Sequence, residues 1–226
     1  MSKKGGTRHM KRLASPPYMK LKRKASKFVV KPLPGRHTIA NSMALSTFIK
    51  EKLEIAKSSA EAKRAIVEGK IEINGRVRRE PRYPIGFGDV IKVIPSNESY
   101  ILTFGKYGAF EAKKAEKSEK RTLKVVGKYI AKGKKQTIRL NNGNIYGFDK
   151  EVNVNDSVIV EDRKILKVIK LEEGAKCMVT SGIHAPAIGK ITQMKKGTAL
   201  RDATVTIEGD RGSFDTLLSN VIAIGA

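Results

Sequence analysis

The sequence has very little cysteine, histidine and aromatic side chain, and these shortages exclude several classes of protein. Its 226 residues include one cysteine, three histidines and no tryptophan. A single cysteine, Cys177, excludes an internal disulfide and a multi-cysteine zinc site. The histidines are scattered, so we expect no metal cluster and no cofactor. No uncharged run approaches the roughly 18–20 residues that cross a bilayer, so we expect no membrane partner.

Acidic residues are missing from the start of the chain. None precedes Glu51, whereas residues 1–50 hold thirteen lysines and arginines. The whole chain has 46 basic and 22 acidic residues, which gives a formal net charge of +24. Such a surplus predicts a polyanionic partner, because the charges would otherwise repel one another. Residues 151–226 hold ten charges of each sign, so the surplus lies upstream of them.

Residues 1–42 are expected to form a basic, extended N-terminal arm. Four prolines interrupt this segment and no hydrophobic periodicity is sustained. Apolar residues lie between the cations, which favours an arm that follows RNA, with Tyr18 stacking on a base. A disordered solubilising tail is the alternative interpretation.

A compact unit of two helices and a hairpin is predicted over residues 43–96. Apolar residues at helical spacing predict a first helix from Leu45 to Ala56. Ser58–Glu61 has the pattern of a capping box at the start of a second helix. Asn74-Gly75 between apolar residues indicates a hairpin, because both turn positions favour positive φ. A strand over residues 90–94 completes the unit.

The rest of the chain is predicted to be β structure, so the fold class is α+β and mostly β. We expect a central β domain over residues 97–172 and a C-terminal domain over residues 173–226, each of short strands that suggest a small barrel. Residues 112–121 have no bulky apolar face and are expected to be a solvated loop or a short exposed helix. The predicted strands are 100–103, 123–131, 137–140, 157–160, 165–171, 175–179, 189–194, 203–207, 213–217 and 221–224.

Basic side chains gather around the second helix and the hairpin, where they would form a ridge that follows a phosphate backbone. A solvated face balanced by glutamates is the alternative. His9 is expected to contact a phosphate or a base. Together with the arm, the predicted RNA-binding residues are Lys3, Lys4, Arg8, His9, Lys11, Arg12, Tyr18, Lys20, Lys22, Arg23, Lys24, Lys27, Lys57, Lys63, Arg64, Lys70, Arg76, Arg78, Arg79 and Arg82.

Four segments carry a resemblance to a known family. Leu45–Val93, with Ile-Asn-Gly-Arg-Val-Arg at 73–78, resembles the S-four RNA-binding domain. Residues 8–16, 83–91 and 218–225 resemble the fourth small-subunit ribosomal protein of the archaeal/eukaryotic type. This resemblance implies an arm, an S-four domain, a central β domain and a C-terminal SH3-like KOW barrel.

The resemblance implies a structural constituent of the small ribosomal subunit, without enzymatic activity, in the cytoplasm. It would bind small-subunit ribosomal RNA and neighbouring small-subunit ribosomal proteins, support translation, and not form a homo-oligomer. One alternative is an RNA-modifying enzyme of the pseudouridine-synthase kind, but its catalytic aspartate would follow Arg139-Leu140, where this chain has Asn141. The other is a KOW-containing transcription elongation factor, which has no evident use for an acid-free arm.

The KOW resemblance lies in Val179–Gly182 and Gly189–Ile191, and Gly75, Gly182 and Gly189 are the predicted turn glycines. The intervening loop has Pro186 in place of the usual central glycine and contains no lysine. We expect it to pack on a neighbouring protein, to read RNA by shape, or to be a structural turn.

Two remaining residues with reactive side chains are not expected to act in catalysis. Cys177 lies in a predicted strand and is interpreted as a buried small hydrophobic residue. His37 either shapes the junction between the arm and the compact unit or is an exposed loop histidine. No catalytic residue and no metal ligand is predicted.

Overall fold

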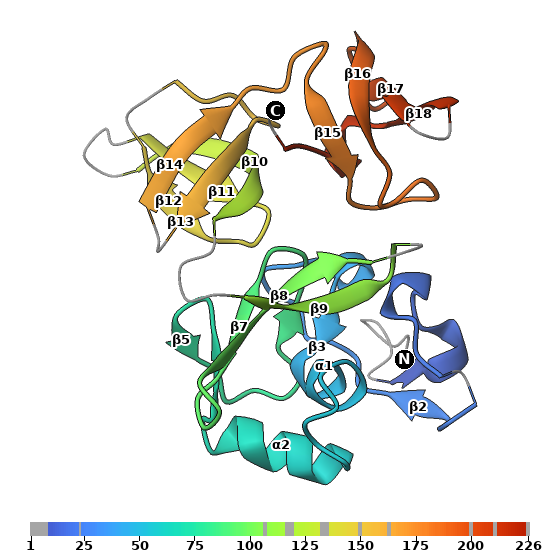
Figure 1. Ribbon diagram of the computed structural model, residues 1–226, viewed down its shortest axis with the longest axis vertical. Helices are drawn as coiled ribbons and strands as arrows, with labels where there is room; N and C mark the ends of the chain where they lie inside the picture. The colour runs from blue at the N-terminus through green and yellow to red at the C-terminus, as the bar shows by residue number, and fades with distance from the viewer. Residues whose placement is uncertain are drawn as a thin grey trace, which may run out of the picture. The chain divides into compact units, whose positions relative to one another are not determined.

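The chain folds into two compact units (Figure 1). The first unit comprises the residues up to Thr103 together with Ala109–Ala115, and the second comprises Phe104–Gly108 and the residues from Glu116 on. As predicted, the fold is mostly β with few helices and several sheets. This computed structural model describes residues 9–22, 24–105, 108–115, 120–131, 136–148, 151–161, 164–198, 201–209 and 212–224.

The arm is less extended than the sequence predicts, because much of it packs on the first unit. Met19 is only 1% exposed, and the backbone N–H of Leu33 donates to the Arg82 carbonyl at 2.9 Å. Strands β1 and β2 pair antiparallel, with Met10 opposite Val29. The arm's elements are β1 Met10–Lys11, the 3₁₀ helices η1 Arg12–Ala14, η2 Pro17–Met19 and η3 Ile39–Asn41, and β2 Phe28–Val29.

The described residues include two α-helices, α1 (Leu45–Glu51) and α2 (Ser59–Val67), both in the first unit. Helix α1 is shorter than predicted: the N–H groups of Lys52 and Leu53 both donate to the Phe48 carbonyl, and Glu54 then adopts a left-handed φ of 53°. The helix therefore closes well before Ala56. None of the helices in the described ranges is long and apolar enough to span a membrane.

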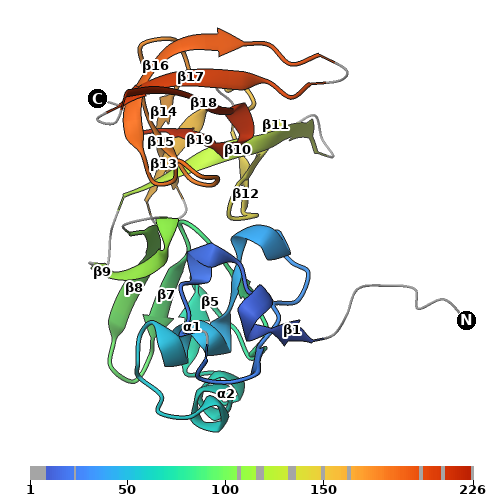
Figure 2. The ribbon, with the colours of Figure 1, turned by 90° about the vertical axis from the view of Figure 1, so that its right-hand side faces the viewer.

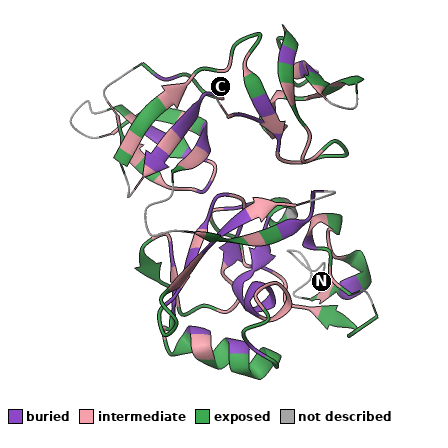
Figure 3. Ribbon diagram, in the orientation of Figure 1, coloured by how far each residue is buried: buried purple, intermediate pink, exposed green. Residues whose placement is uncertain are grey.

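The predicted capping box starts α2. The Ser58 hydroxyl accepts a hydrogen bond from the Glu61 N–H at 3.1 Å, which satisfies one of the open donors of the first turn. Figure 3 shows α1 buried over most of its length and α2 exposed along its outer face. On α2, Ala62 and Ile66 are fully buried, so the helix docks through one narrow stripe.

The first unit has a five-stranded sheet in the order β5-β4-β7-β8-β9 and a two-stranded sheet, β3-β6. The predicted hairpin is present: Asn74 and Gly75 have φ of 50° and 77° between β4 and β5. The strands are β3 Met43–Ala44, β4 Ile71–Ile73, β5 Arg76–Val77, β6 Pro84–Ile85, β7 Val90–Val93, β8 Glu98–Phe104 and β9 Phe110–Ala115.

Strands β8 and β9 extend this sheet beyond the region that the sequence assigns to the compact unit. The expected boundary at residues 96/97 falls inside the turn of the β7–β8 hairpin, where Asn97 has a φ of 53°. Residues 112–115, expected as a loop or helix, belong to β9 instead. Within β9 only Phe110 is buried, so the strand is held by backbone pairing rather than by an apolar face.

The second unit consists of two five-stranded sheets, β12-β11-β10-β13-β14 and β18-β17-β16-β15-β19. Nine of the ten predicted strands overlap strands of this unit, the tenth, 100–103, overlaps β8 of the first unit, and β12 was not predicted. Figure 2 shows β16 and β17 as long paired strands, in agreement with their antiparallel register. The strands are β10 Arg121–Ile130, β11 Gln136–Leu140, β12 Ile145–Gly147, β13 Ser157–Glu161, β14 Lys164–Ile169, β15 Lys176–Val179, β16 Ile188–Lys195, β17 Thr204–Gly209, β18 Gly212–Leu217 and β19 Val221–Ala223.

Each sheet of the second unit has its own apolar core. Leu123, Val125 and Val158 are central to the first core, and Val179, Ile207 and other strand residues form the second. Polar contacts join the sheets within the unit. The Ala223 N–H donates to the Ser157 hydroxyl at 2.9 Å, and the Lys124 ammonium donates to carbonyl oxygens of the 3₁₀ helix η5 (Leu218–Asn220).

Candidate nucleic-acid interface

The structure brings α2 and the β4–β5 hairpin side by side. A Cβ added at Gly69, just beyond α2, would lie 3.3 Å from Val77 Cγ1 and 3.4 Å from Arg79 Nε. Arg79 therefore crosses the C-terminal end of the helix. The Lys70 N–H donates to the Ala65 carbonyl at 3.1 Å and fixes the chain as it passes from helix to strand.

Most of the predicted ridge cations around this junction are exposed. Lys70 Nζ lies 2.7 Å from Glu68 Oε2, and this hydrogen bond lowers the pKa of the Glu68 carboxyl. An exposed ion pair of this kind contributes little to stability, so it leaves the surface free to exchange partners. The exposed predicted cations of this region are Lys57, Lys63, Arg64, Lys70, Arg76 and Arg79.

Two ridge arginines are partly withdrawn into the protein. The Arg78 guanidinium carbon lies 4.9 Å from the centre of the Tyr83 ring, and its Nε is buried with no hydrogen-bond partner among the described residues. Arg82 Nε donates to the Lys31 carbonyl at 3.1 Å and so holds the arm. Arg78 and Arg79 line a pocket of about 580 Å³.

The arm presents a second group of exposed cations. His9 is also exposed, and its ring lies 5.8 Å from that of Phe28. The exposed arm lysines are Lys11, Lys20, Lys22, Lys24 and Lys27. Four predicted arm residues lie outside the described residues: Lys3, Lys4, Arg8 and Arg23.

Arg12 is placed differently from its prediction as an RNA contact. It is 5% exposed, and its Nη2 donates to Glu51 Oε1 on α1 at 2.8 Å. Its Nη1 donates to the Ser26 hydroxyl at 3.1 Å, and its Nε donates to the Lys22 carbonyl. All three guanidinium nitrogens are therefore used within the protein, and Arg12 fastens the arm to α1.

Tyr18 is likewise turned into the protein rather than toward a nucleic-acid base. Its ring packs edge-on against Phe110, with centroids 4.9 Å apart. Its hydroxyl lies 3.0 Å from the Ile39 carbonyl oxygen and 3.2 Å from that of Ser42. Burial raises the pKa of the Tyr18 hydroxyl above its ordinary value. The expected RNA stacking by Tyr18 is thus replaced by packing between the arm and β9.

His37 shapes the junction between the arm and the compact unit, the first of its two interpretations. Its Nε2 lies 2.7 Å from Asp89 Oδ2, and both side chains are buried. The Asp89 carboxylate also accepts from the Gly86 N–H at 3.0 Å and from Asn74 Nδ2 at 2.6 Å. A Cβ at Gly86 would collide with the His37 ring, so glycine is required there. Sequence alone could not pair residues 52 positions apart.

The loop between β15 and β16 carries apolar rather than basic side chains. Gly182 has a φ of 95°, so its turn position disfavours other residues. Gly189 lies in strand β16, where a Cβ would collide with the Glu208 carbonyl oxygen. Ile183 is 98% exposed, and the His184 ring stacks on Phe214 with centroids 4.3 Å apart.

Cys177 is a fully buried residue of the second core, as predicted. Burial raises the pKa of its thiol to about 11, which keeps it protonated and weakly nucleophilic at neutral pH. Within the ranges that the structure describes, no group of three or more His, Cys, Asp or Glu side chains could hold a metal ion.

Two family models match the arm and the compact unit, which hold the predicted RNA-binding residues. Residues 45–91 match the S4 domain, and residues 4–40 match the RS4NT (NUC023) domain. The chain is thus a protein of the S4-domain class, with the compact unit as that domain.

Full-length relatives identify the family. Small ribosomal subunit protein eS4 of Archaeoglobus fulgidus is 33% identical over 220 residues, which cover 96% of this chain and 93% of that protein. The protein of the same name from Methanocella arvoryzae is 32% identical over 219 residues, covering 96% and 94%. The chain belongs to the small ribosomal subunit protein eS4 family.

A solved structure agrees with this assignment. The crystal structure of 30S ribosomal protein S4e from Thermoplasma acidophilum resembles the chain with a TM-score of 0.65 and 29% sequence identity. The likeness covers 82% of this chain and 96% of that one. The fold and the full-length sequence matches therefore point to the same family.

Sequence reasoning missed several residues that hold this surface in place. The sequence pattern assigns no role to Glu51 or Asp89, although they are the partners that fix Arg12 and His37. Ser46 and Lys50 of α1 were not singled out either, and they lie beside the arm. The one available signal was the apolar residues interleaved in the arm, which pack on protein as readily as on RNA.

Proposed function

We propose that this chain is a structural constituent of the small ribosomal subunit that binds ribosomal RNA through its arm and its S4 domain. The observation that carries this proposal is the gathering of exposed lysines and arginines from both segments on one compact unit. The full-length relatives favour this function over an RNA-modifying enzyme and over a transcription elongation factor. In this role the chain supports translation without being an enzyme.

The physical basis is the release of counterions from the RNA backbone. Each lysine or arginine that meets a phosphate frees condensed cations, so affinity depends steeply on salt. The arm in this proposal is a preformed part of the surface, because Arg12 and Tyr18 already fasten it to α1 and β9. Preformed contacts lower the entropy that must be lost on binding.

The finer domain assignment is also part of this proposal. We infer four parts: the arm (1–42), the S4 domain (predicted as 43–96), a central β domain (predicted as 97–172) and an SH3-like KOW barrel (173–226). Because β8 and β9 belong to the sheet of the first unit, we set the boundary between the second and third parts after β9 instead of at 96/97. The antiparallel order β18-β17-β16-β15-β19 supports the last. Its balanced charge and exposed Ile183 suit contact with a neighbouring small-subunit protein. One copy of the chain would act in each subunit.

The experiment compares two variants that each lose five positive charges. In the first, glutamine replaces the exposed arm lysines Lys11, Lys20, Lys22, Lys24 and Lys27. In the matched control, glutamine replaces exposed lysines of the second unit: Lys164, Lys167, Lys170, Lys176 and Lys190. Affinity for transcribed small-subunit ribosomal RNA is measured by filter binding over a series of KCl concentrations.

The arm variant is expected to flatten the plot of log affinity against log salt concentration. Each lost phosphate contact lowers the slope by about 0.7–0.9. The control should retain nearly the wild-type slope. Equal flattening in both variants would show that binding follows net charge alone and would contradict a dedicated interface. Co-sedimentation of the wild-type chain with small subunits tests the ribosomal assignment separately.

A further inference from the structure

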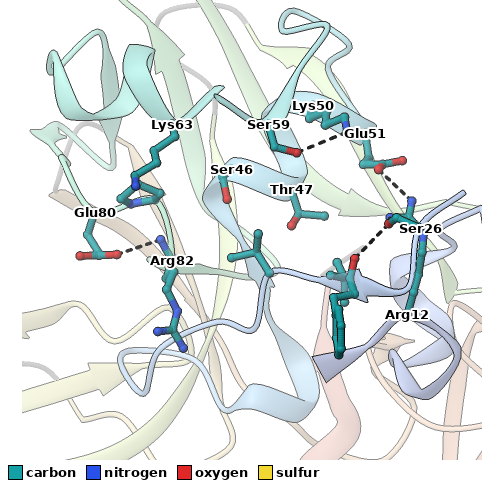
Figure 4. Close-up of a pocket in the computed structure, with 14 residues that line it drawn as sticks. Arg12, Ser26, Ser46, Thr47, Lys50, Glu51, Ser59, Lys63, Glu80 and Arg82 are labelled. Atoms are coloured by element: carbon teal, nitrogen blue, oxygen red, sulfur yellow. Dashed lines mark hydrogen bonds and ion pairs between the residues drawn. The ribbon is translucent and has the colours of Figure 1, made fainter. Parts of the chain in front are cut away.

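A pocket of about 540 Å³ lies between the arm and the S4 domain (Figure 4). We call it the arm pocket. Its volume falls within the roughly 300–1,000 Å³ that is usual for ligand sites. The arm pocket is lined by Arg12, Ser26, Phe28, Val29, Val30, Ser46, Thr47, Lys50, Glu51, Ser59, Lys63, Glu80, Pro81 and Arg82.

The arm pocket contains a buried hydroxyl with no partner. Ser46 is 6% exposed, and its Oγ makes no hydrogen bond to any described part of the chain. Figure 4 shows Ser46 in the middle of the lining residues, between Lys63 and Thr47. A buried polar group without a partner is unfavourable. The pocket therefore offers a hydrogen-bonding group that a bound molecule would satisfy.

The acidic residues at the arm pocket are already engaged, whereas cations surround its mouth. Glu51 holds Arg12 Nη2 at 2.8 Å, and Glu80 Oε1 accepts from the Arg82 N–H at 3.1 Å. Lys50 Nζ donates to the Ser59 hydroxyl at 3.3 Å and has no acidic partner among the residues that the structure describes. Lys63 is exposed on α2. The pocket's remaining electrostatic preference is for an anion at its rim.

The arm side of the pocket is apolar and aromatic. Val29 and Val30 line the pocket from the arm, and Pro81 lines it from the S4 domain. Phe28 is 49% exposed, and Lys27 Nζ lies 5.5 Å from the centre of its ring. Proteins bind unpaired nucleotides with this combination: an aromatic face for stacking, a hydroxyl for the base edge and cations for the phosphate. An apolar peptide would leave the Ser46 hydroxyl and the rim cations unmatched.

We propose that the arm pocket receives the base of one unpaired nucleotide of small-subunit ribosomal RNA. Ser46 Oγ bonds to the edge of the base, Phe28 stacks on it, and Lys63 meets the adjoining phosphate. This inference rests on the proposed function, since it names the nucleotide class that the same interface takes. It adds a base-reading site to a surface otherwise suited to phosphates.

The test fills the pocket with a larger side chain and measures the chemical protection of single bases of the RNA. The full chain is bound to transcribed small-subunit ribosomal RNA and probed with dimethyl sulfate and a carbodiimide, which together modify the Watson–Crick edges of all four unpaired bases. Wild type should protect one unpaired base that Ser46→Leu exposes again, with about tenfold weaker binding. Ser213→Leu, at an exposed serine of β18, is the matched control and should retain wild-type affinity and protection.

A second variant keeps the test decisive if Ser46→Leu does not fold. Phe28 is half exposed, so Phe28→Ala should leave the fold intact and still remove the same base protection. Wild-type binding with every protection retained in a folded Ser46→Leu or in Phe28→Ala would overturn the pocket assignment alone. No binding of ribosomal RNA by wild type would instead overturn the proposed function.

Discussion

The two units of the molecule bury charged side chains in different ways. In the first unit, buried Arg12 has Glu51 as its partner at 2.8 Å, and buried Asp89 lies 2.7 Å from His37. In the second unit, buried Lys124 donates to the carbonyl oxygens of Leu218 and Ser219 at 2.6 and 3.1 Å. In the first unit these buried groups thus have an ionisable side chain as a partner, whereas in the second the partners of Lys124 are backbone carbonyls.

Asp156 follows the same rule as Lys124. It is 5% exposed, and its carboxylate accepts from the N–H groups of Asn153 and Leu171 at 2.8 and 3.1 Å. Side-chain pairs connect segments that are far apart in sequence, as Arg12 and Glu51 connect the arm to α1. The backbone carbonyls that bind Lys124 also lie far away, 94 and 95 positions along the chain, whereas Asp156 accepts from N–H groups within 15 positions. The basic arm is thus held by two acidic side chains with little exposure to solvent, Glu51 and Asp89.

Surface charge separates the units as well. The first unit has 25 basic and 9 acidic residues, whereas the second has 21 and 13. Two of the first unit's acids, Glu51 and Asp89, are used to fix Arg12 and His37, so they oppose a polyanion less than their number suggests. The same two contacts therefore anchor the arm and engage two acidic side chains that would otherwise repel a polyanion.

The largest effect is expected from breaking the His37–Asp89 pair. Asp89→Ala leaves His37, the Gly86 N–H and the Asn74 amide without their acceptor. Each buried donor that loses its acceptor costs about 1–3 kcal/mol, so the loss of an acceptor shared by three donors costs several kcal/mol. Hydrogen exchange followed by mass spectrometry should show this loss in the first unit and little change in the second.

Asp215→Ala is the control for that measurement. Asp215 is exposed on β18 and accepts a hydrogen bond from Thr206. Exposed substitutions usually change stability by less than about 0.5 kcal/mol. Wild-type exchange in the first unit of Asp89→Ala would mean that the arm is held without this pair.

The second prediction concerns Lys124, the buried lysine of the second unit. Burial lowers the pKa of Lys124 from 10.5 to about 8. Between these pH values the unfolded chain binds a proton that the folded chain has released, so raising the pH stabilises the folded state. The contribution approaches about 3 kcal/mol, at about 1.4 kcal/mol for each pH unit.

Urea unfolding of wild type and Lys124→Met across this pH range isolates the effect, because other groups titrate alike in both proteins. The free energy of unfolding of wild type should rise relative to the variant between pH 8 and pH 10.5. A difference that does not vary with pH would mean that Lys124 titrates normally. Burial also lowers the pKa of Lys52 in the first unit, so the comparison with Lys124→Met is what assigns the rise to Lys124.

Local patterns in the sequence were enough to predict the elements that depend on neighbouring residues. The Asn74-Gly75 hairpin and the Ser58 cap of α2 follow from backbone conformations that few residues adopt. Strand β9 was missed because Phe110 is its only buried residue and pairing with β8 holds the rest. Its formation is a tertiary event that a hydrophobic pattern does not record.

The candidate site was predicted in part for the same reason. The composition alone predicts that most lysines and arginines are exposed, because 22 acidic residues are too few to pair with 46 basic ones inside the protein. Which of them turn inward depends on distant partners: Arg12 on Glu51, and Arg82 on the Lys31 carbonyl. Ser46 gave no signal, since a serine in a short helix is ordinary until the arm encloses it.

The smallest effect is expected from the S4 ridge, the group of exposed lysines and arginines around α2 and the β4–β5 hairpin. The sequence predicts Arg76, Arg78 and Arg79 as its centre, but Arg78 lies over the Tyr83 ring. The sharper variant is Lys63→Ala with Arg76→Ala and Arg79→Ala. All three side chains are exposed, so the fold should survive and the slope of log affinity against log salt should fall by about 2–3.

A matched control removes one exposed lysine and two exposed arginines from the second unit: Lys195, Arg139 and Arg201. If filter binding to small-subunit ribosomal RNA gives the two variants the same slope, the S4 ridge has no special part in recognition. A lower slope for the ridge variant alone would place the RNA backbone along α2 and the hairpin. Because the arm is fastened to the same unit, its lysines and the ridge should then act together, and combining the two sets of substitutions should lower the slope by close to the sum of both.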